Sequence, residues 1–305
     1  MGRYFARRAV HSIFILIGVS LVTFLLVHMT GDPVTLFLPL DAGPEAVRAM
    51  RTALGFDRPL YQQYASFLQG AVSGDFGTSL RHREGALDLV LGRLPATMQL
   101  TFVAMGVAVV VAVPLGVVAA THKDSAASLA ASLLGLLGQS MPTFWLGIMM
   151  ILLFSVSLRW LPASGRGSLV HLIMPALAIG TYSMAMVMRL MRSTMIEVLS
   201  LDFVRTARAK GLSEQVVVYK HGLRNALIPV VTVVGLQFGT LLGGAVITET
   251  VFAWPGLGRF LIQGLNNRDM PVVQAAVFVM ALMIVSVNLL TDMVYSYLDP
   301  TVRFS

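Results

Sequence analysis

One basic segment, residues 202–229, stands between two apolar stretches of the chain and reads DFVRTARAKGLSEQVVVYKHGLRNALIP. It carries five Lys or Arg residues against two acids. Cationic side chains at this density could bind nucleic acid, mark the cytoplasmic side of a membrane protein or form a docking surface for another protein. The elements on either side of the segment decide among these three uses.

Residue patterns typical of catalytic and metal sites do not occur in the sequence. The chain has no cysteine, which excludes disulfides, thiolate metal ligands and Cys nucleophiles. It has no H-E-x-x-H zinc motif and no G-x-S-x-G nucleophile elbow, and its six histidines are scattered. It also lacks G-x-x-x-x-G-K-[ST], so it cannot hold a nucleotide with a P-loop. We predict no catalytic residue, metal site or cofactor in this chain, and no enzymatic activity of its own.

The composition is that of a membrane protein. Hydrophobic residues make up 56% of the 305 residues, charged residues make up 12%, and the mean hydropathy is +0.78. A soluble domain has roughly a quarter of its residues charged. In a membrane chain the formal net charge of +7 first reports orientation, so we expect a lipid bilayer and no nucleic acid as the partner.

Six apolar stretches are each long enough to cross a bilayer, which takes about 20 residues of helix. The first is preceded by Arg3, Arg7 and Arg8 like a signal peptide, but its apolar core is too long and no cleavage site follows. The sequence therefore predicts an all-α polytopic protein with six transmembrane helices. These cover residues 9–29, 99–120, 131–157, 173–191, 227–248 and 273–296.

The distribution of basic residues predicts the orientation of the chain. Six crossings put both termini on one side of the membrane, and the short segments on that side hold twelve Lys and Arg residues. The short segments on the other side hold four, which are Arg159, Arg166, Arg259 and Arg268. Because Lys and Arg are concentrated in short cytoplasmic loops, we expect both termini to be cytoplasmic.

The long segment after the first span is predicted to be helical and external. Pro44 and Gly55 punctuate one helix, and residues 60–72 repeat apolar side chains at helical spacing. We divide the chain into residues 1–98, a first transmembrane helix with an external helical loop, and residues 99–305, a transmembrane core with a cytoplasmic loop at about 192–226.

The basic segment itself contains the start and end residues of two short helices. Ser200 can cap the first helix, and Gly211 can take the left-handed conformation that ends it. Ser213 can cap the second helix, which we expect to end at Gly222. The Val-Val-Tyr stripe of the second helix would need burial, so a docking surface competes with a simple solvated loop. Both ends enter the bilayer within a few residues, which disfavours a DNA-reading helix-turn-helix.

Polar side chains within the spans are candidates for a solute path, because such groups prefer a wet cavity or the bundle interior. The residues that could line a pore are Gln237, Thr240, Gly244, Gln139 and Ser140. Near the outer end of the fifth span, an acid and an aromatic cluster could form a gate or contact a partner. These are Glu249, Phe252, Trp254 and Pro255.

Motifs along the whole chain resemble one family, the integral membrane permeases of bacterial ABC importers, in the branch that takes up peptides, nickel chelates and glutathione. RTARAKGL (205–212) and HGLRNALIPVVT (221–232) resemble its EAA motif, although the naming glutamate is replaced by Arg205 or Thr206. TETVFAWPGLGRFL (248–261) and RDMPVVQA (268–275) are similar to its next landmarks. FLLVHMTGDP (24–33) and GDFGTS (74–79) resemble its N-terminal half.

The resemblance implies a type I ABC importer (MetI-like) permease fold that forms half of a translocation pathway for dipeptides or oligopeptides, with glutathione or a nickel chelate as alternatives. It implies a heterodimer with a second homologous permease, two ATPase subunits that bind ATP and Mg²⁺, and an extracytoplasmic solute-binding protein. It assigns ATPase coupling to the basic segment. The implied coupling residues are Arg205, Thr206, Ala207, Ala209, Lys210, Gly211, Leu212, Val217, Tyr219, Lys220, His221, Arg224 and Asn225.

Two other classes of membrane protein compete with this interpretation. A stand-alone secondary transporter commonly places carboxylates at mid-bilayer, and no acid lies at the middle of any predicted span. An intramembrane enzyme would need a catalytic dyad or metal set, which the span residues do not supply. Both classes are disfavoured.

Overall fold

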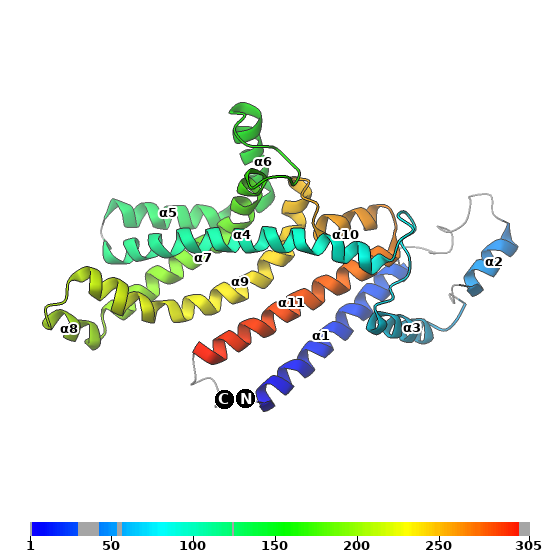
Figure 1. Cartoon of the computed structure of the whole chain (residues 1–305), viewed down its shortest axis with the longest axis horizontal. Coiled ribbons are helices and arrows are strands. Elements are labelled where there is room, and N and C mark those ends of the chain that lie inside the picture. The colour runs from blue at the N-terminus through cyan, green and yellow to red at the C-terminus, as the bar shows by residue number, and fades with distance from the viewer. Residues whose placement is uncertain (1, 30–42, 54–56, 124, 299–305) are drawn as a thin grey trace. The chain divides into compact units, whose positions relative to one another are not determined.

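The computed structural model describes residues 2–29, 43–53, 57–123 and 125–298, and every long element among them is a helix (Figure 1). A single isolated bridge pairs Thr78 with Gly85. The elements are α1 (Gly2–Met29), α2 (Pro44–Ala53), α3 (Leu60–Ser73), α4 (Ala86–Thr121), α5 (Ala126–Ser140), α6 (Thr143–Met150), the π-helical segment η2 (Ile151–Ser157), α7 (Val170–Leu199), α8 (Asp202–Ala209), the π-helical segment η3 (Val216–Gly222), α9 (Leu223–Val251), α10 (Leu257–Asn266) and α11 (Met270–Leu298).

Four helical stretches of the described chain are long and apolar enough to cross a membrane. They are α4, α7, the continuous helix Val216–Val251 and the Met270–Met293 part of α11. The predicted spans 99–120, 173–191 and 227–248 each lie inside one of them, and the fourth covers most of 273–296. The helix α1 adds a shorter apolar segment, Val10–Leu25, among its described residues.

The predicted span 131–157 is not one straight helix but is broken into two pieces. Ser128–Ser140 and Thr143–Ser157 are two helical pieces that meet at 106°. Pro142 precedes α6 and Met141 before it is extended, with φ −84° and ψ 127°. Proline has no N–H to donate and disfavours a helical conformation in the residue before it, which explains the break. Six crossings stay a prediction, because the described residues hold four long apolar helices and this bent pair.

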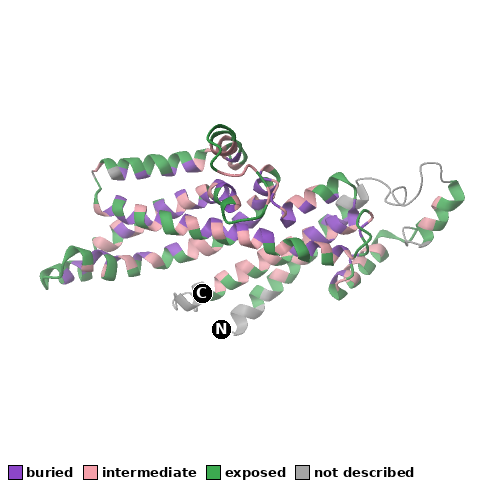
Figure 2. Cartoon of the chain, turned by 45° about the horizontal axis from the view of Figure 1, so that its top comes forward, coloured by how far each residue is buried: buried purple, intermediate pink, exposed green. Residues whose placement is uncertain are grey.

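Large apolar side chains are exposed on several helices, as expected where lipid or another subunit replaces water. Figure 2 shows that α5 is largely exposed, and its Leu129, Leu133 and Leu136, spaced i, i+4 and i+7 on one face, are each at least 50% exposed. A soluble protein would bury such a stripe. We infer that this face lies against hydrocarbon or a partner helix.

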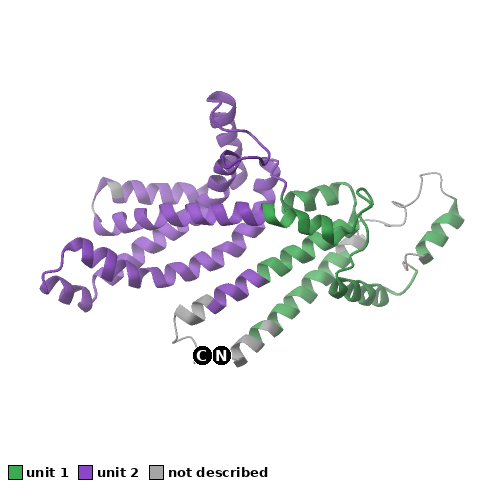
Figure 3. Ribbon diagram, in the orientation of Figure 1, with its two compact units in different colours: residues 1–96, 256–285 green, residues 97–255, 286–305 purple. Residues whose placement is uncertain are grey.

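The chain divides into two compact units, each with its own core (Figure 3). The first comprises residues 1–96 and 256–285, and its core includes Phe76, Val90 and Val272. The second comprises residues 97–255 and 286–305, and its largest core gathers α4, α5, α7 and α9. The predicted division at residue 98 lies near one boundary, but residues 256–285 group with the N-terminal unit.

Small residues let the helices of the second unit approach closely. A Cβ on Gly180 of α7 would lie 2.9 Å from the carbonyl oxygen of Ala104 in α4, and one on Gly138 of α5 would lie 3.0 Å from Thr181 of α7. Between apolar helices in lipid, packing contacts rather than water exclusion drive association, so glycine at such points permits close backbone contact.

The two predicted helices of the first long loop are confirmed as helices. They are α2 (Pro44–Ala53) and α3 (Leu60–Ser73). The helix α3 ends at Gly74, whose φ of +80° is the left-handed conformation that glycine adopts without strain. Their predicted external location stays a prediction.

We expect Gly180→Ala to lower the thermal stability of the purified protein, because the new methyl group meets backbone that cannot rotate away. Overpacking of this kind costs about 1–3 kcal/mol. Gly243→Ala in α9 is the matched control, since no atom lies within 4 Å of a Cβ there. Thermal unfolding in detergent should show a lower Tm for Gly180→Ala only, and equal shifts would contradict the close packing.

Candidate functional site

The first helix of the basic segment, α8, begins at Asp202, and the predicted cap by Ser200 is wrong. Ser200 instead ends α7, where its Oγ donates to the carbonyl of Glu197 at 2.6 Å. Leu201 is the extended residue before α8. A serine hydroxyl can bond backward to the preceding turn as well as forward to the next one, and here the longer α7 takes it.

The end of α8 is as predicted. Gly211 has φ +75°, and its N–H donates to the carbonyl of Arg208 at 2.9 Å. The space around it is open, with no atom within 4 Å of a Cβ built there. Glycine is therefore required by the backbone conformation of the turn and not by crowding.

The second helix does not end at Gly222, as predicted, but runs on without a break. Helical structure starts at Glu214, passes through η3 and continues as α9 to Val251. Gly222 has φ −71°, and a Cβ there would lie 2.8 Å from the Cε of Met195 in α7. This glycine allows η3 to pack against α7, so the second half of the basic segment is the first part of one long apolar helix.

A small apolar core of its own holds the basic segment together. Val204 and Val217 are 0% exposed and Ala207 is buried beside them, with Leu199 packed on this cluster. The expectation that the valine stripe needs an outside partner is therefore wrong for Val217. The large apolar side chains exposed between residues 201 and 222 are Leu201, Phe203, Leu212 and Tyr219.

An ion pair ties the two halves of the basic segment across its turn. The Nε of Arg208 donates to Oε1 of Glu214 at 2.6 Å, and a second guanidinium nitrogen reaches Oε2 at 3.3 Å. The hydrogen bond from Arg208 lowers the pKa of Glu214, and the same bond raises the pKa of Arg208. Glu214 therefore stays ionised at neutral pH, and the pair is lost only as the pH falls through its lowered pKa.

We call residues 202–222, which comprise α8, the turn at Gly211 and η3, the knob. Most of the implied coupling residues lie on its surface. Ala207 and Val217 are buried, and His221 is half-buried. The backbone carbonyl of His221 accepts a hydrogen bond from Nδ2 of Asn225 at 2.8 Å. The exposed members are Arg205, Thr206, Ala209, Lys210, Gly211, Leu212, Tyr219, Lys220, Arg224 and Asn225.

A groove of about 880 Å³ lies beside the knob within the second unit. The end of α4 lines it with His122 and Lys123, and the basic segment lines it with Arg208, Glu214 and Tyr219. The sequence signalled only the basic segment. The turn after α4 joins it because α4 and α7 end at the same end of the bundle (Figure 1).

The predicted pore residues occupy different environments. Gln237 is buried, and its Nε2 has no hydrogen-bond partner among the described residues. Thr240 and Ser140 are exposed, whereas Gly244 and Gln139 are half-buried. Their role in a solute path stays a prediction.

The predicted outer gate residues lie mainly inside the second unit. Glu249 is 0% exposed and accepts a 2.5 Å hydrogen bond from the hydroxyl of Thr97. Its carbonyl accepts from the N–H of Trp254 at 2.8 Å, and Trp254 and Phe252 are buried. Pro255 is half-buried. In this conformation, three of the four residues support the end of α9 rather than a surface.

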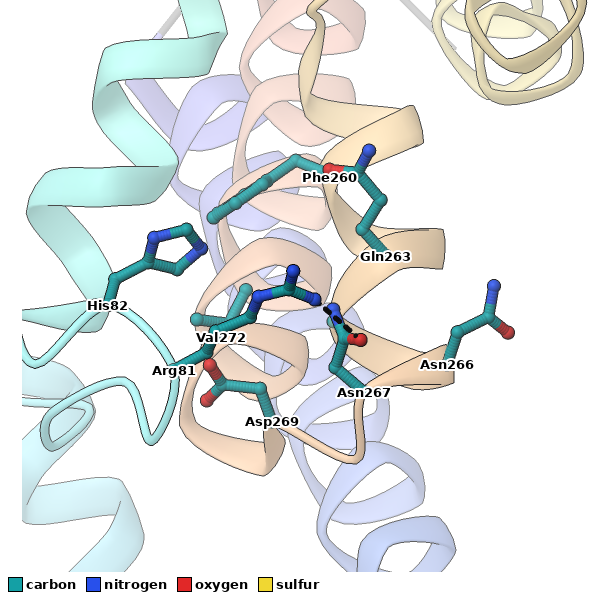
Figure 4. Close-up of a pocket in the computed structure, with 9 residues that line it drawn as sticks. Arg81, His82, Phe260, Gln263, Asn266, Asn267, Asp269 and Val272 are labelled. Carbon is teal, nitrogen blue, oxygen red and sulfur yellow. Dashed lines mark hydrogen bonds between the residues drawn. The ribbon is translucent and has the colours of Figure 1, made fainter.

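A polar recess in the first unit was missed by the sequence reasoning (Figure 4). Asp269 is buried and accepts from the hydroxyl of Ser79 at 2.5 Å and from the N–H of Leu80 at 3.3 Å. Arg81 donates to Oδ1 of Asn267 at 2.8 Å. The sequence shows GDFGTS and RDMP as two separate motifs and does not indicate that they lie together. Their pairing, across 190 residues of chain, has no local signal.

Comparison with known proteins decides the family. Residues 112–304 match the binding-protein-dependent transport system inner membrane component, and residues 1–101 match the N-terminal part of such membrane components. The chain belongs to this family. The resemblance to ABC importer permeases is thus confirmed.

Named permeases are similar over all or nearly all of the chain. The dipeptide transport system permease protein DppB of Escherichia coli K12 is 42% identical, with 94% of each chain covered. DppB of Alkalihalophilus pseudofirmus is 40% identical, with both chains fully covered. The glutathione transport system permease protein GsiC of E. coli K12 is 42% identical, also with both fully covered.

Solved permease structures share the fold. The MetNI methionine ABC transporter in an inward-facing conformation has a TM-score of 0.59 and 19% identity, covering 69% of this chain and 96% of that one. An amino acid ABC transporter crystallised with histidines has a TM-score of 0.51 and 18% identity, with coverages of 69% and 94%. The predicted MetI-like fold class is confirmed.

We expect Ala207→Asp to loosen the knob, because an unpaired carboxylate would enter the cluster around Val217. Burying such a charge costs several kcal/mol. Ala209→Asp is the matched control, since the same change falls on an exposed position of the same helix. Limited trypsin digestion should cleave at Arg205 and Lys210 faster in Ala207→Asp alone. Equal cleavage rates would contradict the internal core.

Proposed function

We propose that this permease forms half of the translocation pathway for dipeptides and oligopeptides, driven by ATP hydrolysis on partner subunits. The observation that carries the proposal is the knob on α9, an exposed apolar and basic surface built on a rigid spanning helix. Full-length similarity to two DppB permeases supports the substrate class. A second homologous permease supplies the other half of the pathway.

The knob is the docking site for an ATPase subunit. Phe203, Leu212 and Tyr219 are 40–58% exposed on a segment that also exposes several basic side chains. Aromatic and aliphatic anchors surrounded by polar residues are typical of protein interfaces. Lys210 and Lys220 add positive charge around these anchors, which favours an acidic rim on the partner.

Movement of the ATPase subunits reaches the membrane through helix continuity. Because η3 passes into α9 without a loop, a displacement of the knob must rotate or translate α9 itself. The helix α7 would move with it, since Gly222 packs against Met195. Alternating access needs such a rigid-body motion, with ATP and Mg²⁺ held entirely by the partner subunits.

The solute path runs past α9. The side-chain amide of Gln237, buried without a partner in the described chain, would gain a hydrogen bond from water or a peptide group entering the path. Gly244 and Thr240 leave room on neighbouring turns. Gln139 and Ser140, at the bend before α6, contribute further polar groups to the same path.

The orientation follows the charge distribution, with both termini and the knob in the cytoplasm of a bacterial inner membrane. The extracytoplasmic loops then face the solute-binding protein. Glu249, Phe252, Trp254 and Pro255 stabilise the outer end of α9 and act as an outer gate through that helix.

Glutathione is a second candidate solute, favoured by the 42% identity with GsiC over the whole chain. Glutathione is itself a small peptide, so the two candidates need the same kind of polar path. Competition experiments separate them.

Reconstitution tests the proposed function. Proteoliposomes that contain this chain, its second permease, both ATPases and the binding protein should accumulate a radiolabelled dipeptide when ATP is present. The chain alone should neither hydrolyse ATP nor move the dipeptide. Uptake by the chain alone would establish a secondary transporter. Competition by glutathione but not by di- or tripeptides lacking a γ-linkage would assign glutathione.

Docking through the knob is tested at Gly211. Gly211→Val places a β-branched residue at φ +75°, which costs about 1–2 kcal/mol and distorts the turn. Gly211→Asn is the control, because asparagine tolerates this conformation. We expect the valine variant to bind the ATPase subunits about tenfold more weakly in copurification titrations. If both variants bind the ATPase subunits as the wild type does, the knob is not part of that interface.

A further inference from the structure

The recess between the 79–82 loop and α10 has the chemistry of a carboxylate receptor. Figure 4 shows Arg81 and His82 on the loop side, and Gln263, Asn266 and Asn267 on the side of α10 and its following turn. All five are exposed, and they surround a pocket of about 310 Å³. Guanidinium and amide N–H groups are donors that match carboxylate oxygens.

The recess is held in shape by a buried acid. Asp269 is 3% exposed, and both of its oxygens accept hydrogen bonds from the loop, from Ser79 and Leu80. The Asp269 carboxylate is thereby hydrogen-bonded to the Ser79 hydroxyl and the Leu80 backbone N–H of the loop. Arg81 is oriented by Asn267 from the same turn. The loop and the α10–α11 turn therefore form one preorganised surface rather than two independent segments.

The electrostatic balance favours an anion. Residues 79–93 and 256–269 together hold five arginines against three acids, one of which, Asp269, is buried and hydrogen-bonded to Ser79 and Leu80. Arg93 lies over the ring of Phe260, which forms the apolar wall, at 5.4 Å from the ring centroid. Arg81 uses one of its five N–H donors on Asn267, which leaves the guanidinium able to form a fork with a carboxylate.

The size of the pocket points to a single side chain as the occupant. Pockets that enclose small ligands have volumes of about 300–1,000 Å³, so this open recess is at the lower limit. Under the proposed orientation it faces the extracytoplasmic space, where a solute-binding protein must dock. The side-chain amides of the recess both donate and accept hydrogen bonds, so they can pair with polar groups of a protein. A lipid phosphate is better matched by several clustered cations.

We propose that this recess receives an Asp or Glu side chain of the solute-binding protein and fixes that protein's position on the permease. The inference rests on the proposed function and deepens it. Arg81 is the principal positioning residue, with Asn266 and Gln263 completing the receptor and Asp269 holding the loop in place.

The test uses the complete importer in nanodiscs and its solute-loaded binding protein, with ATPase stimulation as the readout. Arg81→Glu should raise the concentration of binding protein needed for half-maximal stimulation about tenfold, with basal ATPase unchanged. Arg83→Glu is the matched control. It makes the same charge change in the same loop, at an exposed residue outside the recess, and should have a much smaller effect.

A charge swap identifies the occupant. Single Asp→Lys or Glu→Lys substitutions on the permease-facing surface of the binding protein should include one that restores stimulation of the Arg81→Glu complex. The proposal is overturned if none does so, or if Arg81→Glu and Arg83→Glu behave alike.

Two further outcomes would also overturn it. Loss of the second permease during purification of Arg81→Glu would place the recess in the subunit interface. An altered response to phosphatidylglycerol in the nanodisc, with normal response to the binding protein, would assign the recess to a lipid phosphate. Failure of the wild-type complex to import any peptide is a separate result, because it contradicts the proposed function and not the recess.

Discussion

Backbone hydrogen bonding inside hydrocarbon is the constraint on which this structure depends. No water reaches the N–H and C=O groups there, so each must be satisfied within its own helix. The described chain meets this requirement with long helices such as α4 and α7, which approach each other closely at Gly180. The sharp break at Pro142 is the exception, and it coincides with polar residues that we place on the solute path.

The same constraint supports the proposed coupling role of the knob. A continuous helix transmits displacement along its length, and η3 and α9 form one such helix, in which Pro229 alone removes a backbone hydrogen bond. The turn at Gly211 and the pair between Arg208 and Glu214 fold α8 back onto this rod, and Val204 and Val217 lock it there. An exposed apolar surface is thereby attached to a spanning helix with no flexible joint between them.

Buried acids have a different task at the other proposed face of the protein. Glu249 binds Thr97 within the second unit, and Asp269 binds Ser79 and Leu80 within the first. An isolated buried carboxylate would be costly, so each is hydrogen-bonded and fixes a segment distant in sequence. Neither lies in mid-span, which agrees with energy entering through partner subunits rather than through a proton or ion site.

The sequence by itself determined four long apolar helices, the helices α2, α3 and α8, the left-handed turn at Gly211 and the family, because hydropathy and backbone preferences act over a few residues. Only the tertiary structure decided that Val217 is buried, that Gly222 continues a helix against Met195, and that the predicted span 131–157 bends. It also decided the pairing of Ser79 with Asp269. Burial and pairing depend on atoms from segments that are remote in sequence. A local sequence pattern does not specify which of those segments will pack against it.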